Sequence, residues 1–130
     1  MGAWSYTSFD NDDALDFIFE VEEDGEPAVA NAFEVVNFLK QGEDPERGDA
    51  CVALAAAELV AARGGKPPTY FPEQAAALVP KISDHKDLKA DALKAVQRVL
   101  RQSELRELWS MTEDFDKWRT HVEDLLERLK

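Results

Sequence analysis

Residues 50–63 constrain the fold more than any other part of the chain. Their sequence, ACVALAAAELVAAR, is apolar on nearly every side of a helix and is followed by Gly64-Gly65, a natural helix end. A helix that is apolar all round must be covered by other elements, and its alanines let neighbouring helices approach closely. The segment therefore predicts a central, deeply buried helix.

The segments before this helix also have apolar residues at helical spacing. A polar loop is expected over residues 42–48, between the second helix and the central one. The first helix is expected to have its cap at Asp10 or Asn11 and to end at Asp24-Gly25. The second helix is expected to begin at Pro27 and to end at Gly42, and Asp49 is expected to cap the central helix.

After the central helix, residues 66–72, KPPTYFP, predict a rigid non-helical connector because of their three prolines. Four further helices are expected beyond it. The first of them runs from Glu73 to Val79 and stops at Pro80. The second has its cap at Ser83 and ends near Arg101, and the third has its cap at Ser103 and ends at Trp109. The last begins at Thr112.

No segment has sustained period-two alternation, and residues 17–21, FIFEV, follow a helix cap, so strands are not expected. The sequence predicts an all-α protein in which residues 1–130 form a single compact bundle of about six or seven helices. Residues 1–9 are expected to be an aromatic arm packed across the bundle. The structural anchors expected are Trp4, Phe9, Asn11, Trp109 and Trp118.

The net charge of −12 comes entirely from the first fifty residues. Residues 1–50 hold fourteen Asp and Glu against two Lys and Arg, whereas residues 51–130 hold thirteen of each. With a pI near 4.5, nucleic acid and anionic membrane surfaces are not expected partners. A strongly negative region on a neutral body instead favours a positively charged partner.

The expected location is the cytoplasm. The first apolar run is interrupted by Asp10, Asp12 and Asp13, so no secretory signal is expected. No apolar stretch approaches the roughly 20 residues that span a bilayer. The one cysteine, Cys51, excludes an internal disulfide and is expected to be a small buried apolar residue.

The aspartates of residues 9–16, FDNDDALD, allow two interpretations. Asp10, Asp12, Asp13 and Asp16 carry oxygen ligands suited to a hard cation, although position 6 of an EF-hand loop would be Leu15 instead of glycine. The favoured interpretation is a capped helix start with a solvated acidic face and no metal. The candidate partner-binding residues on that face are Asp12, Asp16, Glu20 and Glu23.

No catalytic residue and no cofactor are expected. His85 and His121 lack the spacing of metal ligands on one helical face and have no nucleophile paired with them in sequence, so surface or boundary positions are favoured for both. Lys94, Arg98 and Arg101 form a basic stripe, which is either an anion or partner site or a solvated face opposite the acidic helix.

The opening residues resemble a known family. GAWSYTSFDNDDALDF is similar to the signature of the bacterial family catalogued as domain of unknown function 4259, whose members begin Gly-Ala-Trp-Gly and continue Phe-x-Asn-Asp-x-Ala-x-Asp-Trp. Ser5 and Phe17 depart from it, and the similarity continues through Ala55–Ala62 and Ser103–Trp109. The resemblance implies a small, free-standing cytosolic protein and brings no established activity, cofactor or catalytic residue.

Three functions follow as hypotheses. The leading one is a non-catalytic, immunity-like domain that engages a basic protein partner through the acidic face of residues 10–50. The second is a divalent-cation-binding enzyme or sensor that uses the cluster from Asp10 to Asp16. The third is a structural module that forms a homodimer through an apolar helix face.

Overall fold

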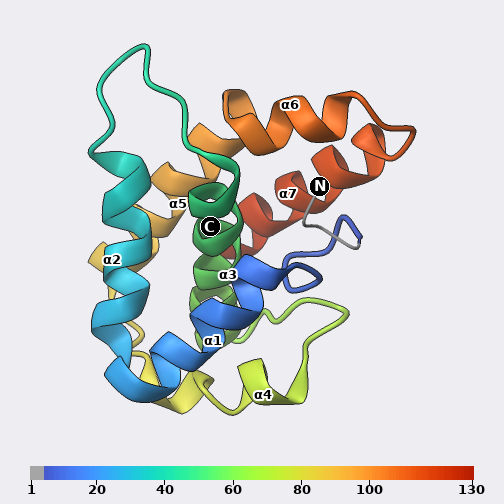
Figure 1. Ribbon diagram of the computed structural model, residues 1–130. Coiled ribbons are helices and arrows are strands. Elements are labelled where there is room, and N and C mark those ends of the chain that lie inside the picture. Colours follow the sequence, from blue (N-terminus) through green and yellow to red (C-terminus); the bar gives the residue numbers. More distant parts are fainter. Residues whose placement is uncertain (1–4) are drawn as a thin grey trace.

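The computed structural model describes residues 5–130, so Trp4, the first expected anchor, lies outside the described residues. This part of the chain forms seven α-helices, one short 3-10 helix and no strand, which confirms the all-α prediction (Figure 1). The helices are α1 (Asp12–Asp24), α2 (Glu26–Asn37), α3 (Arg47–Arg63), α4 (Glu73–Ala76), η1 (Val79–Lys81), α5 (Lys86–Arg101), α6 (Glu104–Ser110) and α7 (Phe115–Leu129).

The central helix of the bundle is α3, as the apolar segment predicts. It packs against α1, α2, α5, α6 and α7, and it is buried from Ala50 to Ala61 except for the half-buried Val52. In Figure 1 it stands between α2 on one flank and α6 and α7 on the other. Cys51 is buried on this helix, where burial and the nearby charge of Asp13 raise the pKa of its thiol to about 12.

The start of α1 joins the N-terminal arm to the bundle. Asn11, and not Asp10, is the cap: its side chain accepts a hydrogen bond from the Ala14 amide at 2.8 Å and donates one to the Ser8 carbonyl at 3.3 Å. Phe9 is buried, and its ring centroid lies 5.8 Å from that of Phe71. These contacts fix the backbone of Ser8 beside the bundle.

The other two expected anchors both lie in the C-terminal helices. Trp109 on α6 and Trp118 on α7 are buried. Ser103 caps α6 as predicted, accepting a hydrogen bond from the Arg106 amide at 3.0 Å. The C-terminal helices are thus held to α3 by large apolar side chains and a local cap.

The predicted cap at Asp49 is wrong. α3 begins at Arg47, three residues before the expected first residue, Ala50, and its first amide donates to Glu104 Oε1 at 2.9 Å. The Glu104 amide in turn donates to the Pro45 carbonyl at 2.9 Å. A side chain from α6 therefore caps this helix, and Asp49 lies in its first turn, where a carboxylate suits the helix dipole.

The predicted cap at Ser83 is also wrong. α5 begins at Lys86, and His85 is its cap, accepting a hydrogen bond from the Asp87 amide at 3.1 Å. The Ser83 amide instead donates to Glu26 Oε1 at 2.6 Å. Hydrogen bonding from Ser83 lowers the pKa of Glu26 and ties the start of α2 to the chain before α5.

Three other boundaries differ from the prediction. α2 ends at Asn37, and Gly42 follows in the loop with a φ of +92°, a conformation that favours glycine. The helix expected from Glu73 to Val79 is split into α4 and η1, and Pro80 lies inside η1. Thr112 forms a turn with the Asp114 amide, so α7 begins three residues later than expected.

Within residues 5–130, no helix combines the length and the apolar character needed to cross a bilayer.

Candidate functional site

Two regions of the molecule concentrate charged groups. The first is the acidic face, which we define as the carboxylates of residues 10–50 on α1, α2 and the start of α3. The second is the Glu58 pocket, which we define as the cavity lined by Tyr6, Thr7, Ser8, Glu58, Pro68, Thr69, Tyr70, His121, Asp124 and Arg128.

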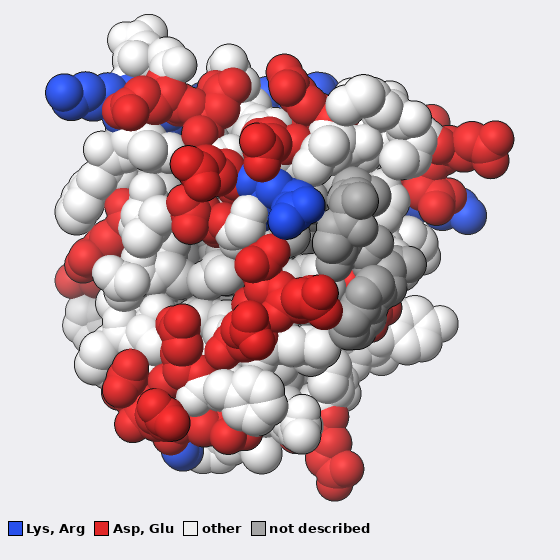
Figure 2. Space-filling view, in the orientation of Figure 1, with Lys and Arg blue, Asp and Glu red and all other residues white. Residues whose placement is uncertain are grey.

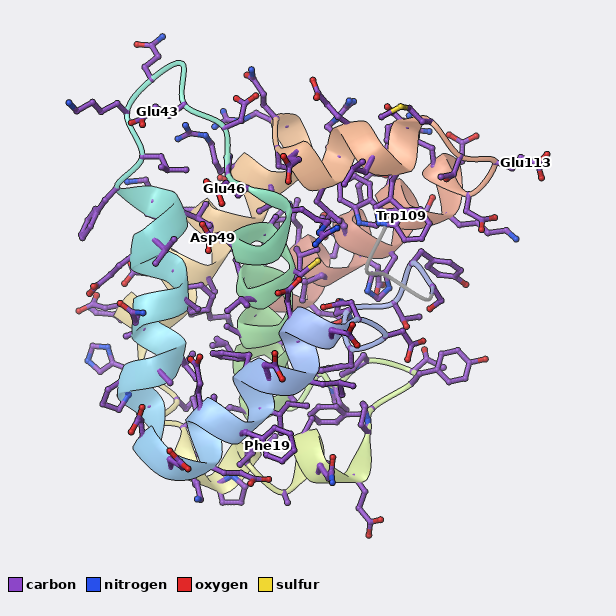
Figure 3. The ribbon with its side chains drawn as sticks, in the orientation of Figure 1. Phe19, Glu43, Glu46, Asp49, Trp109 and Glu113 are labelled. Carbon is purple, nitrogen blue, oxygen red and sulfur yellow. The ribbon has the colours of Figure 1, made fainter. Side chains whose placement is uncertain are left out.

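The acidic face is exposed on the side of the molecule formed by α1 and α2. The four sequence-predicted residues, Asp12, Asp16, Glu20 and Glu23, all lie on α1 and are exposed. Figure 2 shows Asp and Glu side chains gathered over this side, with few Lys or Arg side chains among them. In Figure 3, Glu43, Glu46 and Asp49 continue the charge along the loop before α3 and into its first turn.

The carboxylates of the acidic face lie outside every ion pair found within residues 5–130. Those ion pairs use only the acids Glu58, Asp87, Asp114, Asp116, Asp124 and Glu127. The basic stripe does reach the edge of this region, but Arg98 donates to the backbone carbonyls of Lys40 and Glu43 and not to a carboxylate. Asp12, Asp16, Glu20 and Glu23 are therefore directed to solvent. Glu26, at the start of α2, instead accepts a hydrogen bond from the Ser83 amide.

An aromatic side chain and a groove accompany these charges. Phe19 on α1 is 56% exposed, and Figure 3 shows its ring on the outer side of the helix. A groove of about 180 Å³ lies on the surface where α1, α2 and α3 meet, with the carboxylates of Glu20 on α1 and Asp49 on α3 at its edges. Its lining residues are Phe17, Glu20, Ala28, Asn31, Ala32, Val35, Asp49 and Val52.

The aspartates at the start of α1 do not converge. Asp10 Oδ2 accepts hydrogen bonds from the Ser5 and Thr7 hydroxyls at 2.7 Å each. Asp13 lies against Gly48 of α3, where a Cβ would stand 3.3 Å from its Oδ1, whereas Asp12 and Asp16 are exposed. Within residues 5–130, no three His, Cys, Asp or Glu side chains gather closely enough to hold a metal ion.

The Glu58 pocket is assembled around a buried carboxylate. Glu58 lies in the apolar helix α3 and is 0% exposed. Its Oε1 accepts a hydrogen bond from Arg128 Nη1 at 2.7 Å, and its Oε2 accepts one from the Ser8 hydroxyl at 2.9 Å. His121 Nε2 lies 2.8 Å from Ser8 Oγ and 3.4 Å from Glu58 Oε2.

Three residues of α7 line the pocket because their side chains lie on one face of the helix. His121, Asp124 and Arg128 are spaced by three and four residues, so their side chains project from the same side of the helix. Arg128 Nε donates to Asp124 Oδ2 at 2.8 Å, and its Nη1 also donates to the Lys66 carbonyl at 3.3 Å. The guanidinium is therefore held between two carboxylates and the connector after α3.

The hydrogen bonds define the proton positions. The Ser8 hydroxyl has one proton, which it donates to Glu58, so Ser8 Oγ accepts from His121 Nε2. Nε2 therefore carries a proton, and in the neutral ring the lone pair is on Nδ1. Burial would raise the pKa of Glu58, but the contacts with His121 and Arg128 outweigh burial and lower that pKa.

The trio of Ser8, His121 and Glu58 does not have the geometry of an activated nucleophile. In a Ser-His-acid triad, the histidine nitrogen that faces serine accepts the hydroxyl proton and the acid binds the other ring nitrogen. Here the serine hydroxyl and Glu58 both lie next to the same nitrogen, Nε2. The arrangement holds a buried negative charge in place and does not prepare Ser8 for attack.

The sequence-based reasoning missed this site. The sequence favours a surface or boundary position for His121, and the structure finds this residue half-buried in the middle of α7. No nucleophile is paired with His121 in sequence, but the structure places the Ser8 hydroxyl beside its ring. The available signal was Glu58 itself, the one acid within the apolar run of residues 50–63. A charge in a helix that must be buried requires a partner from elsewhere in the chain.

Comparison with known proteins gives a family and no function. No curated protein and no solved structure matches the chain. A family model described as "Domain of unknown function (DUF4259)" matches residues 2–121. That range contains Ser8, Glu58 and His121, as well as the whole acidic face. Because the match covers most of the chain, the protein belongs to the DUF4259 family.

Proposed function

We propose that the protein is a binding domain whose acidic face engages a basic surface of another protein. The observation that carries the proposal is the exposure of the Asp12, Asp16, Glu20 and Glu23 carboxylates on one helix, outside the ion pairs of residues 5–130. A partner with lysines and arginines at matching positions would supply the missing counter-charges. Complementary charge of this kind speeds association and selects against other acidic proteins.

Phe19 and the groove supply the apolar part of such an interface. Charges at the rim of an interface contribute mainly to the rate of association, whereas buried aromatic side chains often carry much of the affinity. Phe19 is an exposed aromatic on α1, and the groove is edged by Glu20 and Asp49. A basic side chain of the partner can place its alkyl stem in the groove and its charge between these carboxylates.

An immunity-like role is the more specific form of this proposal. Its support is the charge, because a small acidic domain is suited to neutralise a cationic toxin by covering its basic surface. Expression of the protein together with a toxin encoded beside it tests this form. Protection of the cells would support the role, and killing that is unaffected by the protein would remove it.

Affinity capture tests the broader proposal. The protein is immobilised as wild type, as the acidic-face variant D12N/D16N/E20Q/E23Q, and as the matched control E73Q/D84N/D91N/E123Q, which removes the same charge from exposed positions outside this face. The proposal predicts a basic partner that the wild type and the control retain and the acidic-face variant loses. Equal retention of that partner by all three proteins would contradict it.

Two other hypotheses stay as predictions. No side-chain cluster within residues 5–130 favours the divalent-cation site, which calorimetric titration with Ca²⁺, Mg²⁺ and Mn²⁺ tests. The homodimer is tested by light scattering, since exposed apolar side chains such as Phe38 and Met111 are compatible with contact between copies.

A further inference from the structure

We propose that the Glu58 pocket binds a primary alkylammonium group of about four carbons. This site shares no lining residue with the groove of the acidic face and makes no use of it. Its floor is the hydrogen-bonded group of Ser8, Glu58, His121 and Arg128. Its walls come from the arm and from the connector between α3 and α4.

The floor of the pocket is already ordered before any ligand arrives. Glu58 accepts hydrogen bonds from both Arg128 and Ser8, and Arg128 is also held by Asp124. The Ser8 carbonyl is fixed by the buried cap residue Asn11. A ligand therefore meets groups that need no reordering, which reduces the entropy lost on binding.

The charge of the pocket favours a cation. Two carboxylates, Glu58 and Asp124, face one guanidinium, Arg128, so the pocket carries one excess negative charge when His121 is neutral. The chain as a whole, these groups included, has a net charge of −12. An anionic ligand would have to approach against both, although Arg128 alone would attract it.

An aromatic ring at the pocket strengthens this preference. Tyr70 lines the pocket yet is 74% exposed, and its side chain makes no hydrogen bond within residues 5–130. Pro67, Pro68 and Pro72 restrict the connector that carries it. An exposed tyrosine ring that lines the same pocket as two carboxylates is suited to the face-on binding of an ammonium group.

The size of the pocket limits the ligand. Its volume is about 160 Å³, well above the roughly 10–15 Å³ that a cavity needs to hold one water molecule. A butylammonium ion, with five non-hydrogen atoms, is small enough to enter it. Its alkyl part would contact the tyrosine ring and Pro68, while its charged end would lie near the exposed Asp124 carboxylate.

The two histidines of the chain provide a direct readout, because His121 lines the pocket and His85 caps α5 outside it. Histidine ring resonances are followed by NMR at constant pH during titration with n-butylammonium chloride. The proposal predicts a saturable shift of the His121 resonance alone, with a Kd of about 1 mM or below for so small a ligand. n-Butanol and sodium butyrate, of similar size, are expected to bind at least about tenfold more weakly.

Variants at Tyr70 test the geometry without disturbing the core. Tyr70→Ala is expected to raise the Kd by about two- to thirtyfold, while Tyr70→Phe keeps the ring and should leave the Kd near that of the wild type. Asp124→Asn should also weaken binding. The acidic-face variant should bind n-butylammonium normally, so failure of either proposal is distinguishable from failure of the other.

A lysine side chain carries the same group as a free amine, and Nα-acetyl-lysine N-methylamide separates the two sources. Binding of this capped lysine with equal or higher affinity assigns the pocket to a peptide lysine, and binding of n-butylammonium alone assigns it to a small amine. The proposal is overturned by a His121 shift that does not saturate below about 10 mM. Equal binding of n-butanol, or an unchanged Kd in Tyr70→Ala, would also overturn it.

Discussion

The acidic face and the Glu58 pocket use carboxylates in opposite ways. On the acidic face, carboxylates close together in sequence stand exposed on α1, outside every ion pair found within residues 5–130. Lys81 Nζ reaches this helix but donates to the Glu22 backbone carbonyl at 3.1 Å and not to a carboxylate. In the pocket, one carboxylate is fully buried and is bound by groups 50 and 70 residues away in sequence. The comparison indicates that the exposed carboxylates of α1 are available to bind another molecule, whereas the carboxylate of Glu58 is already paired with Arg128 inside the fold.

Removal of the charge of Glu58 should have the largest effect on stability. Glu58→Gln leaves the largely buried guanidinium of Arg128 without its fully buried counter-ion, so we expect a loss of about 3 kcal/mol in the free energy of unfolding. Urea denaturation measures it, with Glu123→Gln as the exposed control on α7, the helix that carries Arg128. Replacement of both partners, as in E58L/R128M, should recover much of the loss. An unchanged midpoint in Glu58→Gln would contradict the contrast between the two regions.

The pH dependence of stability should report the same buried charge. Because the pKa of Glu58 is lowered in the folded protein, its ionised form stabilises the fold above the ordinary value of 4.5, and this contribution is lost as the pH falls through the lowered pKa. Denaturation midpoints measured from neutral pH downward should therefore fall less steeply in Glu58→Gln than in the wild type. Identical slopes for the two proteins would mean that Glu58 is not stabilised in its charged form.

The cap residue that joins the two regions should have an intermediate effect. Asn11 starts the helix that carries the acidic face and also holds the carbonyl of Ser8, so Asn11→Ala should cost about 1 kcal/mol of stability. Asp10→Ala, next to it but exposed, should change stability by less than about 0.5 kcal/mol. Equal effects at the two positions would show that the cap does not order this part of the chain.

Neutralisation of the acidic face should change stability least. Exposed charges contribute little individually, and removal of like charges on one helix relieves repulsion, so each change in D12N/D16N/E20Q/E23Q is expected to shift the free energy of unfolding by less than about 0.5 kcal/mol. Thermal and urea denaturation measure the total. A loss as large as that of Glu58→Gln would mean that these carboxylates support the fold.

The same contrast explains what the sequence could predict. The apolar run around Ala55–Ala57 predicts the central helix because an unbroken apolar composition is a local property of the sequence. Asp12 and Asp16 were correctly expected to be exposed for the same reason. Two predicted helix starts are wrong where distant side chains bind the backbone. Glu104 caps α3, and Glu26 binds the Ser83 amide, so that α5 begins later with His85 as its cap.

The Glu58 pocket could not be read from local patterns. Ser8, Glu58 and Arg128 belong to an arm, a central helix and the last helix, and no spacing rule connects them. Only the requirement that a buried carboxylate be compensated indicated that partners exist, without identifying them. Prediction of their identity needs the packing of α7 against α3, which depends on the whole bundle.

The central claim, that the acidic face is free to engage a basic partner, is tested most directly by the rate of association with the partner retained in affinity capture. Association is measured by stopped-flow at increasing salt for the wild type, the acidic-face variant and the matched control. The account predicts that the acidic-face variant associates at least about tenfold more slowly than the control at low salt, and that its rate depends less on salt. Equal rates and equal salt dependence for the variant and the control would contradict the account.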